Sequence, residues 1–160
     1  MAEVHAEGAE GKHAEDAGRW VMELDDITGA IIDTALGIHR DPGPRLLESL
    51  YEALLARDLR GRGLHVDRQR LIQVSDDGID IENAFRIDLL VERCVIVEVK
   101  SVERLAPVHT TQLLTYLRLT DLRVGLLLNF GAEKMKDGIR RVVNDYKPPR
   151  SSPLRINQPR

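Results

Sequence analysis

Charged side chains stand inside the two most hydrophobic stretches of this 160-residue chain. Asp88 interrupts the run from residue 84 to 91, and Glu98 and Lys100 interrupt the run from residue 94 to 100. Strands that are buried on both faces are nearly all apolar, because removing a charge from water is costly. Two acids and one amine in such runs therefore need a structural or chemical reason.

The spacing decides which of these side chains can meet. Side chains alternate along a strand, so Glu98 and Lys100 lie on one face of it. Asp88 joins them if the two runs form a hairpin in which the residue numbers of each facing pair sum to 186. A two-residue turn at Glu92-Arg93 gives a sum of 185 and places Asp88 on the other face. We therefore predict a three-residue connection, 92–94, or a bulge that shifts the register by one residue.

Two carboxylates and an ammonium group at one place have two interpretations. The first is an ion pair on an exposed or edge face of the sheet, which contributes little to stability. The second is a site for a hard cation. Carboxylate oxygens suit Mg²⁺ or Mn²⁺, and these ions keep water ligands that a substrate phosphate can replace. The spacing alone leaves both interpretations open.

Three helices are indicated by apolar residues that recur at helical spacing. The first is expected over 27–38, behind Asp25 and Asp26, either of which would cap its N-terminus. The second is expected over 47–59, with two glycines ending it, and the third over 108–119. These helices would lie on either side of the charged runs in sequence, close enough to flank them.

The strands follow from extended apolar runs. One is expected over 64–74 with a turn at 75–78, a central hairpin over 84–91 and 94–100, and a further strand over 124–130. The segment 135–143 is expected to be a short final helix. The resulting order, roughly ααβββαβα, indicates an α/β fold with a mixed central sheet flanked by helices.

The two ends of the chain differ in composition from the middle. Residues 1–18 are rich in Ala, Glu, Gly and His and predict a disordered acidic tail. Residues 147–160 carry four prolines and several basic residues, which predicts an extended basic tail without regular structure. The folded domain is expected over 19–146.

The overall composition narrows the class of protein. The formal charge is −3, so a bulk field that attracts polyanions is excluded, although 18 arginines stand against five lysines and would suit local contacts to phosphate. The one cysteine, Cys94, excludes an internal disulfide framework and a Cys-rich zinc site. No signal peptide or membrane span is indicated, so a cytoplasmic protein without membrane contact is expected.

Five segments of the chain form a recognisable combination: LLESLYE at 46–52, FRIDLLV at 85–91, VEVKS at 97–101, QLLTY at 112–116 and LLLNF at 126–130. On these segments the chain resembles the PD-(D/E)XK nuclease superfamily and, within it, the GxxExxY family. The resemblance extends over about 26–144 and implies a restriction-endonuclease-like fold. Arg45 stands where the family motif has glycine, so the entry into the second helix is expected to differ there.

The resemblance implies roles for five groups. Asp88, Glu98 and Glu48, together with the backbone carbonyl of Val99, would hold one or two Mg²⁺ or Mn²⁺ ions, and Lys100 would orient or activate the attacking water. Three carboxylates and one ammonium leave a charge of −2, which one divalent ion neutralises. The implied reaction is metal-dependent hydrolysis of a phosphodiester bond, with DNA as the expected substrate.

Other side chains around these acids have two readings each. Gln112 and Tyr116 are four residues apart on one helical face, and the resemblance implies that they support the site and contact the substrate backbone. Otherwise Tyr116 packs in the core beside a solvated Gln112. His109 either caps the helix or contacts phosphate, and Arg86 either contacts phosphate or neutralises an acid. Tyr51 is expected in the core.

Two alternatives to a nuclease stay open. A catalytically silent module on the same scaffold would bind nucleic acid or a protein partner, because a fold does not fix a function. A structural scaffold would use Glu98 and Lys100 as an ion pair. Nucleases of this size often dimerise to span two strands, so a homodimer is one of the expected arrangements.

Overall fold

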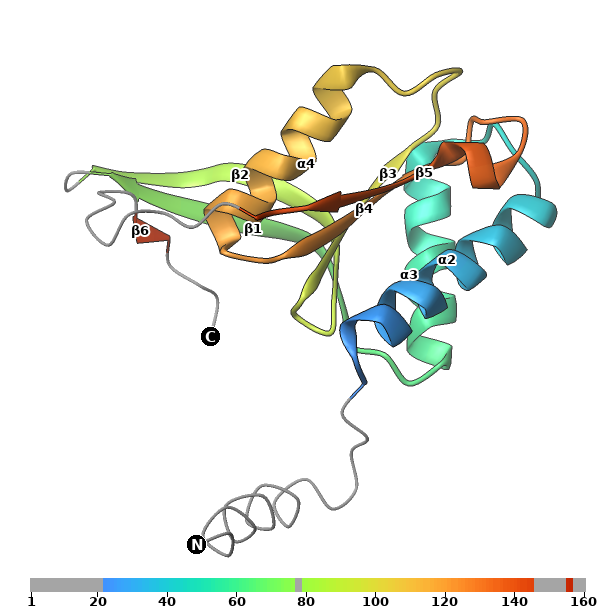
Figure 1. The fold of residues 1–160 in the computed structure, drawn as a ribbon, viewed down its shortest axis with the longest axis horizontal. Coiled ribbons are helices and arrows are strands. Elements are labelled where there is room, and N and C mark those ends of the chain that lie inside the picture. Colours follow the sequence, from blue (N-terminus) through green and yellow to red (C-terminus); the bar gives the residue numbers. More distant parts are fainter. Residues whose placement is uncertain (1–21, 77–78, 146–154, 157–160) are drawn as a thin grey trace, which may run out of the picture.

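The computed structural model describes residues 22–76, 79–145 and 155–156 as one mixed sheet with helices on both sides (Figure 1). The helices are α2 (Leu24–Arg40), α3 (Glu48–Gly61), α4 (Pro107–Thr120) and the 3₁₀ turn η1 (Met135–Gly138). The strands are β1 (Val66–Asp76), β2 (Ile79–Val91), β3 (Val95–Lys100), β4 (Val124–Asn129), β5 (Ile139–Val143) and β6 (Arg155–Ile156). This architecture confirms the expected α/β fold with a mixed central sheet.

The sheet places the charged runs at its centre. Its order is β5-β4-β3-β2-β1-β6, so the hairpin of β2 and β3 is flanked by strands on both sides. β3 and β4 run parallel with α4 as the connection between them, and the other neighbouring strands are antiparallel. Two parallel neighbouring strands need such a crossover, because the chain has to return to the end of the sheet at which the first strand began.

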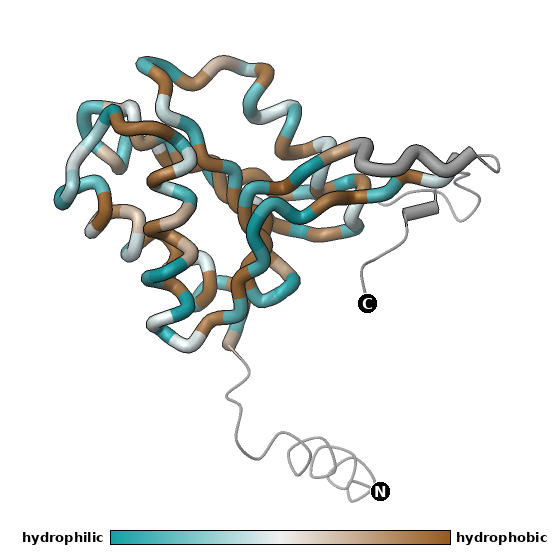
Figure 2. The backbone as a smooth tube through the Cα atoms, turned by 180° about the vertical axis from the view of Figure 1, so that it is seen from behind, coloured by the Kyte–Doolittle hydropathy of each residue, from teal (hydrophilic) through white to brown (hydrophobic). Residues whose placement is uncertain are grey.

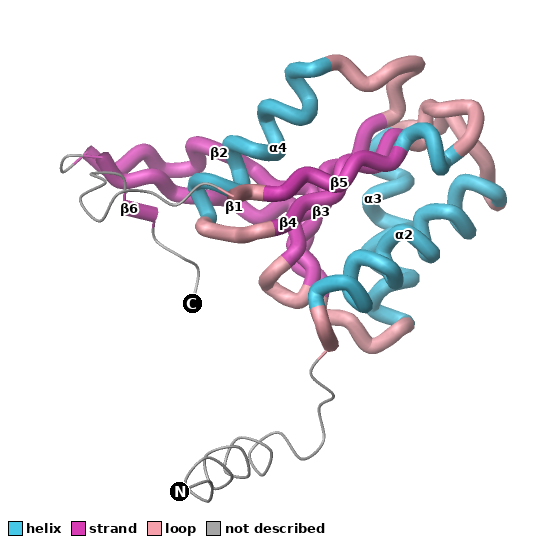
Figure 3. Tube along the Cα trace, viewed as in Figure 1, coloured by secondary structure: helices cyan, strands magenta, loops and turns pink. Residues whose placement is uncertain are grey.

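The two faces of the sheet are covered by different helices (Figure 3). α2 and α3 bury a cluster that includes Ile31, Leu55 and Val97, whereas α4 buries a cluster that includes Ile96 and Leu117. Alternate residues of β3 therefore enter opposite cores, as the two-residue period of a strand requires. Figure 2 shows the hydrophobic segments gathered where the central strands meet the helices.

α2 begins one residue earlier than the positions expected to cap it. Its N-cap is Glu23, which makes no side-chain capping hydrogen bond. Asp25 and Asp26 lie in the first turn, so the prediction that one of them is the cap is wrong. They still favour this end of the helix, because negative charge near the N-terminus interacts well with the helix dipole.

The prediction of a final helix over 135–143 is wrong. Only Met135–Gly138 is helical, as the short turn η1, and Ile139–Val143 forms β5, antiparallel to β4. The segment is rich in β-branched residues, and Val142 is buried under α4 while its neighbours Arg141 and Val143 are exposed. Such alternation suits an edge strand with one buried face.

The ends of the chain were predicted as tails. Residues 1–18 lie outside the described residues, as does most of 147–160. Arg155–Ile156 form the two-residue strand β6 opposite Val74 and Ser75, so the expectation of no regular structure beyond residue 146 is wrong at these two positions. Among the described residues, no helix has the length and apolar character needed to cross a membrane.

Candidate active site

The register of the central hairpin brings Asp88 and Glu98 together. The facing pairs are Leu89–Val97, Leu90–Ile96 and Val91–Val95, whose numbers each sum to 186. Residues 92–94 form the connection, and Glu92 and Arg93 adopt φ values of 49° and 57° there. The prediction of a three-residue connection is therefore confirmed.

The two carboxylates bind the backbone of each other's strand. Beyond the Leu89–Val97 pair, the Val99 N–H donates to Asp88 Oδ2 at 2.9 Å, and the Asp88 N–H donates to Glu98 Oε1 at 3.3 Å. These bonds take the place of further backbone pairing between the two strands. Both carboxylates are held in fixed positions, side by side, because each is tied to a rigid central strand.

Burial and mutual repulsion disfavour ionisation of this pair. Glu98 is 3% exposed, and its burial, together with the charge of Asp88, raises its pKa from 4.5 to about 8. Burial also raises the pKa of Asp88, while the hydrogen bond from Val99 and the charge of Lys100 oppose that rise. Two carboxyl groups this close share a proton near neutral pH unless a cation neutralises them.

Lys100 belongs to the same row of β3 side chains as Glu98. Its charge lowers the pKa of both carboxyl groups, which places it within their electrostatic range. In the described part of the chain, six pairs of oppositely charged side chains lie within 4.0 Å of each other. Lys100 and Glu98 are not one of these pairs. The structure thus lacks the contact on which the scaffold alternative depends.

Glu48 opens α3 beside the end of β3. Its side chain is exposed, and its Oε1 accepts a hydrogen bond from the Ser101 N–H at 3.1 Å. Its charge contributes to the raised pKa of Asp88. Glu48 thus lies next to the site, but its carboxylate is directed to the residue that follows Lys100.

Sequence reasoning did not identify Glu52, a second acid of α3 whose charge acts on Asp88. Glu52 is 6% exposed, and it accepts hydrogen bonds from Gln69 Nε2 at 2.6 Å and Arg68 Nε at 3.1 Å, both from β1. The charge of Glu52 raises the pKa of Asp88 more than the charge of Glu48 does. The four-residue spacing from Glu48 was the available signal, because it puts both acids on one face of the helix.

Tyr51 holds the loop that leads into α3. It is fully buried against Phe130, with ring centroids 4.2 Å apart and planes nearly parallel. Its hydroxyl donates to the Gly43 carbonyl at 2.6 Å and accepts from the Leu46 N–H at 2.9 Å. The expected core position of Tyr51 is confirmed. Arg45, between these anchors, has a φ of 65°, a left-handed conformation that glycine adopts without strain.

α4 brings Gln112 and Tyr116 to the same side of the sheet as Glu98. Gln112 Nε2 donates to the Tyr116 hydroxyl at 2.7 Å. Burial raises the pKa of Tyr116, the charges of Glu98 and Asp88 raise it further, and the charge of Arg86 lowers it. These effects place Tyr116 beside the carboxylate pair, where the Gln112 amide can orient its hydroxyl.

The other two predicted side chains, His109 and Arg86, lie at the edge of the site. His109 Nδ1 accepts a hydrogen bond from the Ala106 N–H at 3.0 Å, so it closes the N-terminus of α4 as the capping interpretation expected. Arg86 is exposed on β2, opposite Leu71 of β1, within the electrostatic range of Tyr116. Neither lies between the two carboxylates.

The donor chemistry of this site suits a divalent cation. Asp88 and Glu98 supply hard oxygen atoms, and the pair is buried, like-charged and next to one lysine. Within residues 22–76, 79–145 and 155–156, no three His, Cys, Asp or Glu side chains stand close enough together to form a complete ligand set. The two strand acids are thus a partial ligand set, which an outer acid or a substrate oxygen would have to complete.

Comparison with known proteins agrees with this geometry. The family model described as the PD-(D/E)XK nuclease superfamily matches residues 25–142, nearly all of the folded region. Neither the curated proteins nor the solved structures give a significant match. Members of the matched superfamily are generally phosphodiester-cleaving nucleases, and they typically use divalent metal ions. The family match agrees with the paired acids on the central hairpin. The chain therefore belongs to the PD-(D/E)XK nuclease superfamily.

Proposed function

We propose that this protein is a Mg²⁺- or Mn²⁺-dependent nuclease of the GxxExxY family that hydrolyses phosphodiester bonds in DNA. The observation that carries the proposal is the Asp88–Glu98 pair, buried on a central hairpin and fixed by reciprocal bonds to the backbone. A buried like-charged pair is unfavourable by itself, and a divalent cation would relieve the repulsion. Lys100 follows on the same row of β3, where an attacking water has to be oriented.

Each group of the proposed site has a separate role in the reaction. Asp88 and Glu98 would hold the cation, with the Val99 carbonyl and Glu48 as further ligands. The cation, when bound, stabilises charge on the scissile phosphate and lowers the pKa of the attacking water. Lys100 positions that water for in-line displacement of the leaving oxygen. No group of the chain needs to form a covalent bond to the substrate.

The side chains of α4 and β2 border the substrate path in this proposal. Gln112 fixes the Tyr116 hydroxyl at 2.7 Å, and the pair supports the carboxylates and contacts the nucleic-acid backbone. Arg86, exposed near Tyr116, contacts a phosphate. His109 caps α4 and lies at the edge of this path.

A second candidate function is a silent module that binds nucleic acid or a protein without cleaving. One observation favours it: Glu48 is bonded to the Ser101 N–H, and no three acids of the described region form a ready ligand set. The two candidates agree on binding and differ on hydrolysis. Metal-dependent cleavage therefore separates them.

The test is digestion of linear DNA in Mg²⁺ or Mn²⁺ by the parent protein and by D88N and K100A. Each substitution should reduce the cleavage rate by at least about a hundredfold, because it removes an interaction with the reacting centre. The matched controls are D33N and K136A, exposed residues of α2 and η1, which should cleave like the parent. Folding of every variant is checked by its thermal transition. Cleavage at the parental rate by folded D88N and K100A would refute the nuclease assignment.

A further inference from the structure

Five described non-glycine residues have a positive φ. Two of them, Arg45 and Gln69, are next to residues of the candidate active site. Glu92 and Arg93 form the β2–β3 connection, and Asp121 ends α4, so local structure accounts for these three. Gln69 holds Glu52, and Arg45 precedes α3. A bulky residue in this conformation is strained relative to glycine, and such strain is often found at functional sites.

The backbone on both sides of Arg45 is fixed. Its own N–H donates to the Phe130 carbonyl at 3.2 Å, and the Leu46 N–H donates to the buried Tyr51 hydroxyl at 2.9 Å. The Leu46 carbonyl accepts a hydrogen bond from Ser101 Oγ at 2.6 Å. The loop is therefore tied to the end of β3, one residue beyond Lys100.

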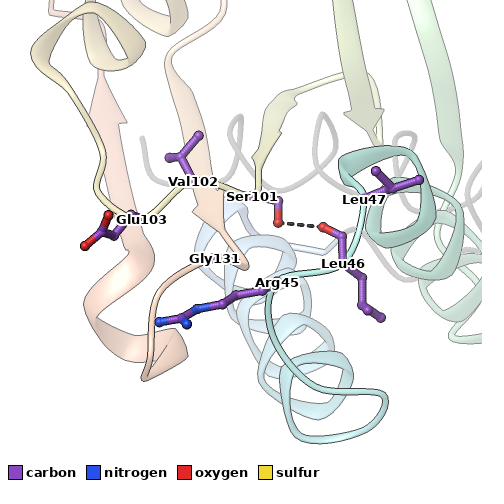
Figure 4. Close-up of a pocket in the computed structure, with 7 residues that line it drawn as sticks. All are labelled: Arg45, Leu46, Leu47, Ser101, Val102, Glu103 and Gly131. Atoms are coloured by element: carbon purple, nitrogen blue, oxygen red, sulfur yellow. Dashed lines mark hydrogen bonds between the residues drawn. The ribbon is translucent and has the colours of Figure 1, made fainter.

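Arg45 projects into a groove of about 800 Å³ (Figure 4). The groove is lined by Arg45, Leu46, Leu47, Ser101, Val102, Glu103 and Gly131. Figure 4 shows the Arg45 side chain extending past Gly131 toward the side where Glu103 lies. Within the described residues, no carboxylate comes within 4.0 Å of the guanidinium, so this exposed cation is available to a ligand.

The wall of this groove is rigid. The buried Asn129 side chain accepts hydrogen bonds from the Val102 and Gly131 N–H groups, each at 3.0 Å, and donates to the Val102 carbonyl at 2.9 Å. Gly131 packs so closely that a Cβ atom there would be 2.2 Å from the Val102 carbonyl oxygen. The wall formed by Val102 and Gly131 is thus preformed, which lowers the cost of ordering this part of the groove around a ligand.

We propose that Arg45 binds a backbone phosphate of the substrate strand in this groove, next to the phosphate that is cleaved. The inference rests on the proposed nuclease function and adds a substrate-binding residue to it. The groove begins at Ser101, directly after Lys100, so a strand lying across the site would pass along it. A guanidinium matches a phosphodiester well, because its planar donors bond two oxygens at once. Glu103 opposes an anion at the far side of the groove and limits the affinity.

The test measures binding separately from cleavage. The Kd for a fluorescein-labelled single-stranded DNA oligonucleotide is measured by anisotropy over a range of salt concentrations, using D88N and the double variant D88N/R45G. The double variant should bind about 5- to 10-fold more weakly, and the slope of log Kd against log salt should decrease by about 0.7, the value for one lost phosphate contact on a single strand. E103Q introduced into D88N should bind the oligonucleotide more tightly than D88N does, because it removes the charge that opposes an anion.

The matched control is R93G. Arg93 is also an exposed arginine with a positive φ, but it lies at the other end of β3, a six-residue strand that spans roughly 20 Å. Both glycine substitutions remove one charge and one strained conformation, so both should keep or raise the Tm. Only R45G should weaken binding or raise the KM for DNA cleavage, with kcat changed by less than about threefold.

Three outcomes overturn the inference, and they are distinguishable. If D88N binds the oligonucleotide and D88N/R45G binds it with the same Kd and salt slope, Arg45 is not a phosphate-binding residue, while the nuclease function stands. If neither D88N nor the parent protein in a metal chelator binds nucleic acid even at low salt, both the role of Arg45 and the proposed function fail. Equal weakening by R93G would also refute the assignment, since it would show a general charge effect.

Discussion

Replacing Glu98 with glutamine should remove a large pH dependence of stability. Burial beside Asp88 raises the pKa of Glu98 from 4.5, its ordinary value, to about 8 in the folded chain. Below pH 4.5 the carboxyl group is protonated in both the folded and the unfolded chain. Between pH 4.5 and 8 the folded chain binds one proton more than the unfolded chain, so the free energy of unfolding falls as pH rises. Above pH 8 both states are ionised and the dependence ends.

The magnitude follows from this interval. At about 1.4 kcal/mol per pH unit, the rise in pKa from 4.5 to about 8 corresponds to about 5 kcal/mol. Solvent screening reduces this little, because Glu98 is 3% exposed. Since whole domains are stable by about 5 to 15 kcal/mol, the metal-free protein should be much less stable at pH 8 than at pH 5.5. E98Q stays neutral and should lack this loss.

The assay is urea denaturation in a metal chelator at several values between pH 5.5 and 8.5. The difference in unfolding free energy between E98Q and the parent should grow with pH by about 1.4 kcal/mol per unit and level off above pH 8. Groups away from this pair are the same in both proteins, so their contributions cancel in the difference. E133Q, which changes an exposed glutamate, is the control and should follow the parent. Parallel profiles for E98Q and the parent would refute the reasoning, because they would show that Glu98 ionises normally.

Three further substitutions test how the site is supported. Y51F keeps the ring and removes the hydroxyl that joins two backbone groups before α3, so urea denaturation should show a loss of about 1–3 kcal/mol; an unchanged stability would contradict the anchoring role. G131A forces a Cβ against a backbone carbonyl and should lower the Tm strongly, whereas G29A, with no atom within 4 Å, should keep or raise it; a Tm for G131A at or above that for G29A would contradict the packing. E52A removes the carboxylate that accepts hydrogen bonds from Arg68 and Gln69 and should cost about 1–3 kcal/mol, more than E52Q, which keeps a hydrogen-bond acceptor; equal losses would show that these hydrogen bonds contribute nothing beyond the charge.

Much of the site's scaffold could be predicted from the sequence because a strand has a strict two-residue period. A shift of one residue would have turned Asp88 to the other face of the sheet, so the requirement that it meet Glu98 fixed the 186 register and the three-residue connection. Helical spacing likewise located α3 and α4, whose apolar faces are continuous. These features depend on local pattern and on one pairing between neighbouring segments.

Two features that the sequence did not predict, β5 and the role of Glu52, depend on contacts between distant segments. Residues 139–143 are apolar at positions that suit a helix or a strand, and only pairing with β4 selects the strand. Glu52 was missed because its partners, Arg68 and Gln69, are 16 and 17 residues away on β1. Its role depends on how α3 is rotated against the sheet, which the helical period alone does not determine.

The most direct test of the proposed cation site is a crystal structure of the protein soaked in Mn²⁺, with anomalous scattering used to locate the ion. A peak within about 2.0–2.3 Å of carboxylate oxygens of both Asp88 and Glu98 is the result we predict, and the peak should be absent in D88N. A protein that cleaves DNA in Mn²⁺ but shows no peak between these two carboxylates, or shows it elsewhere, would contradict the account.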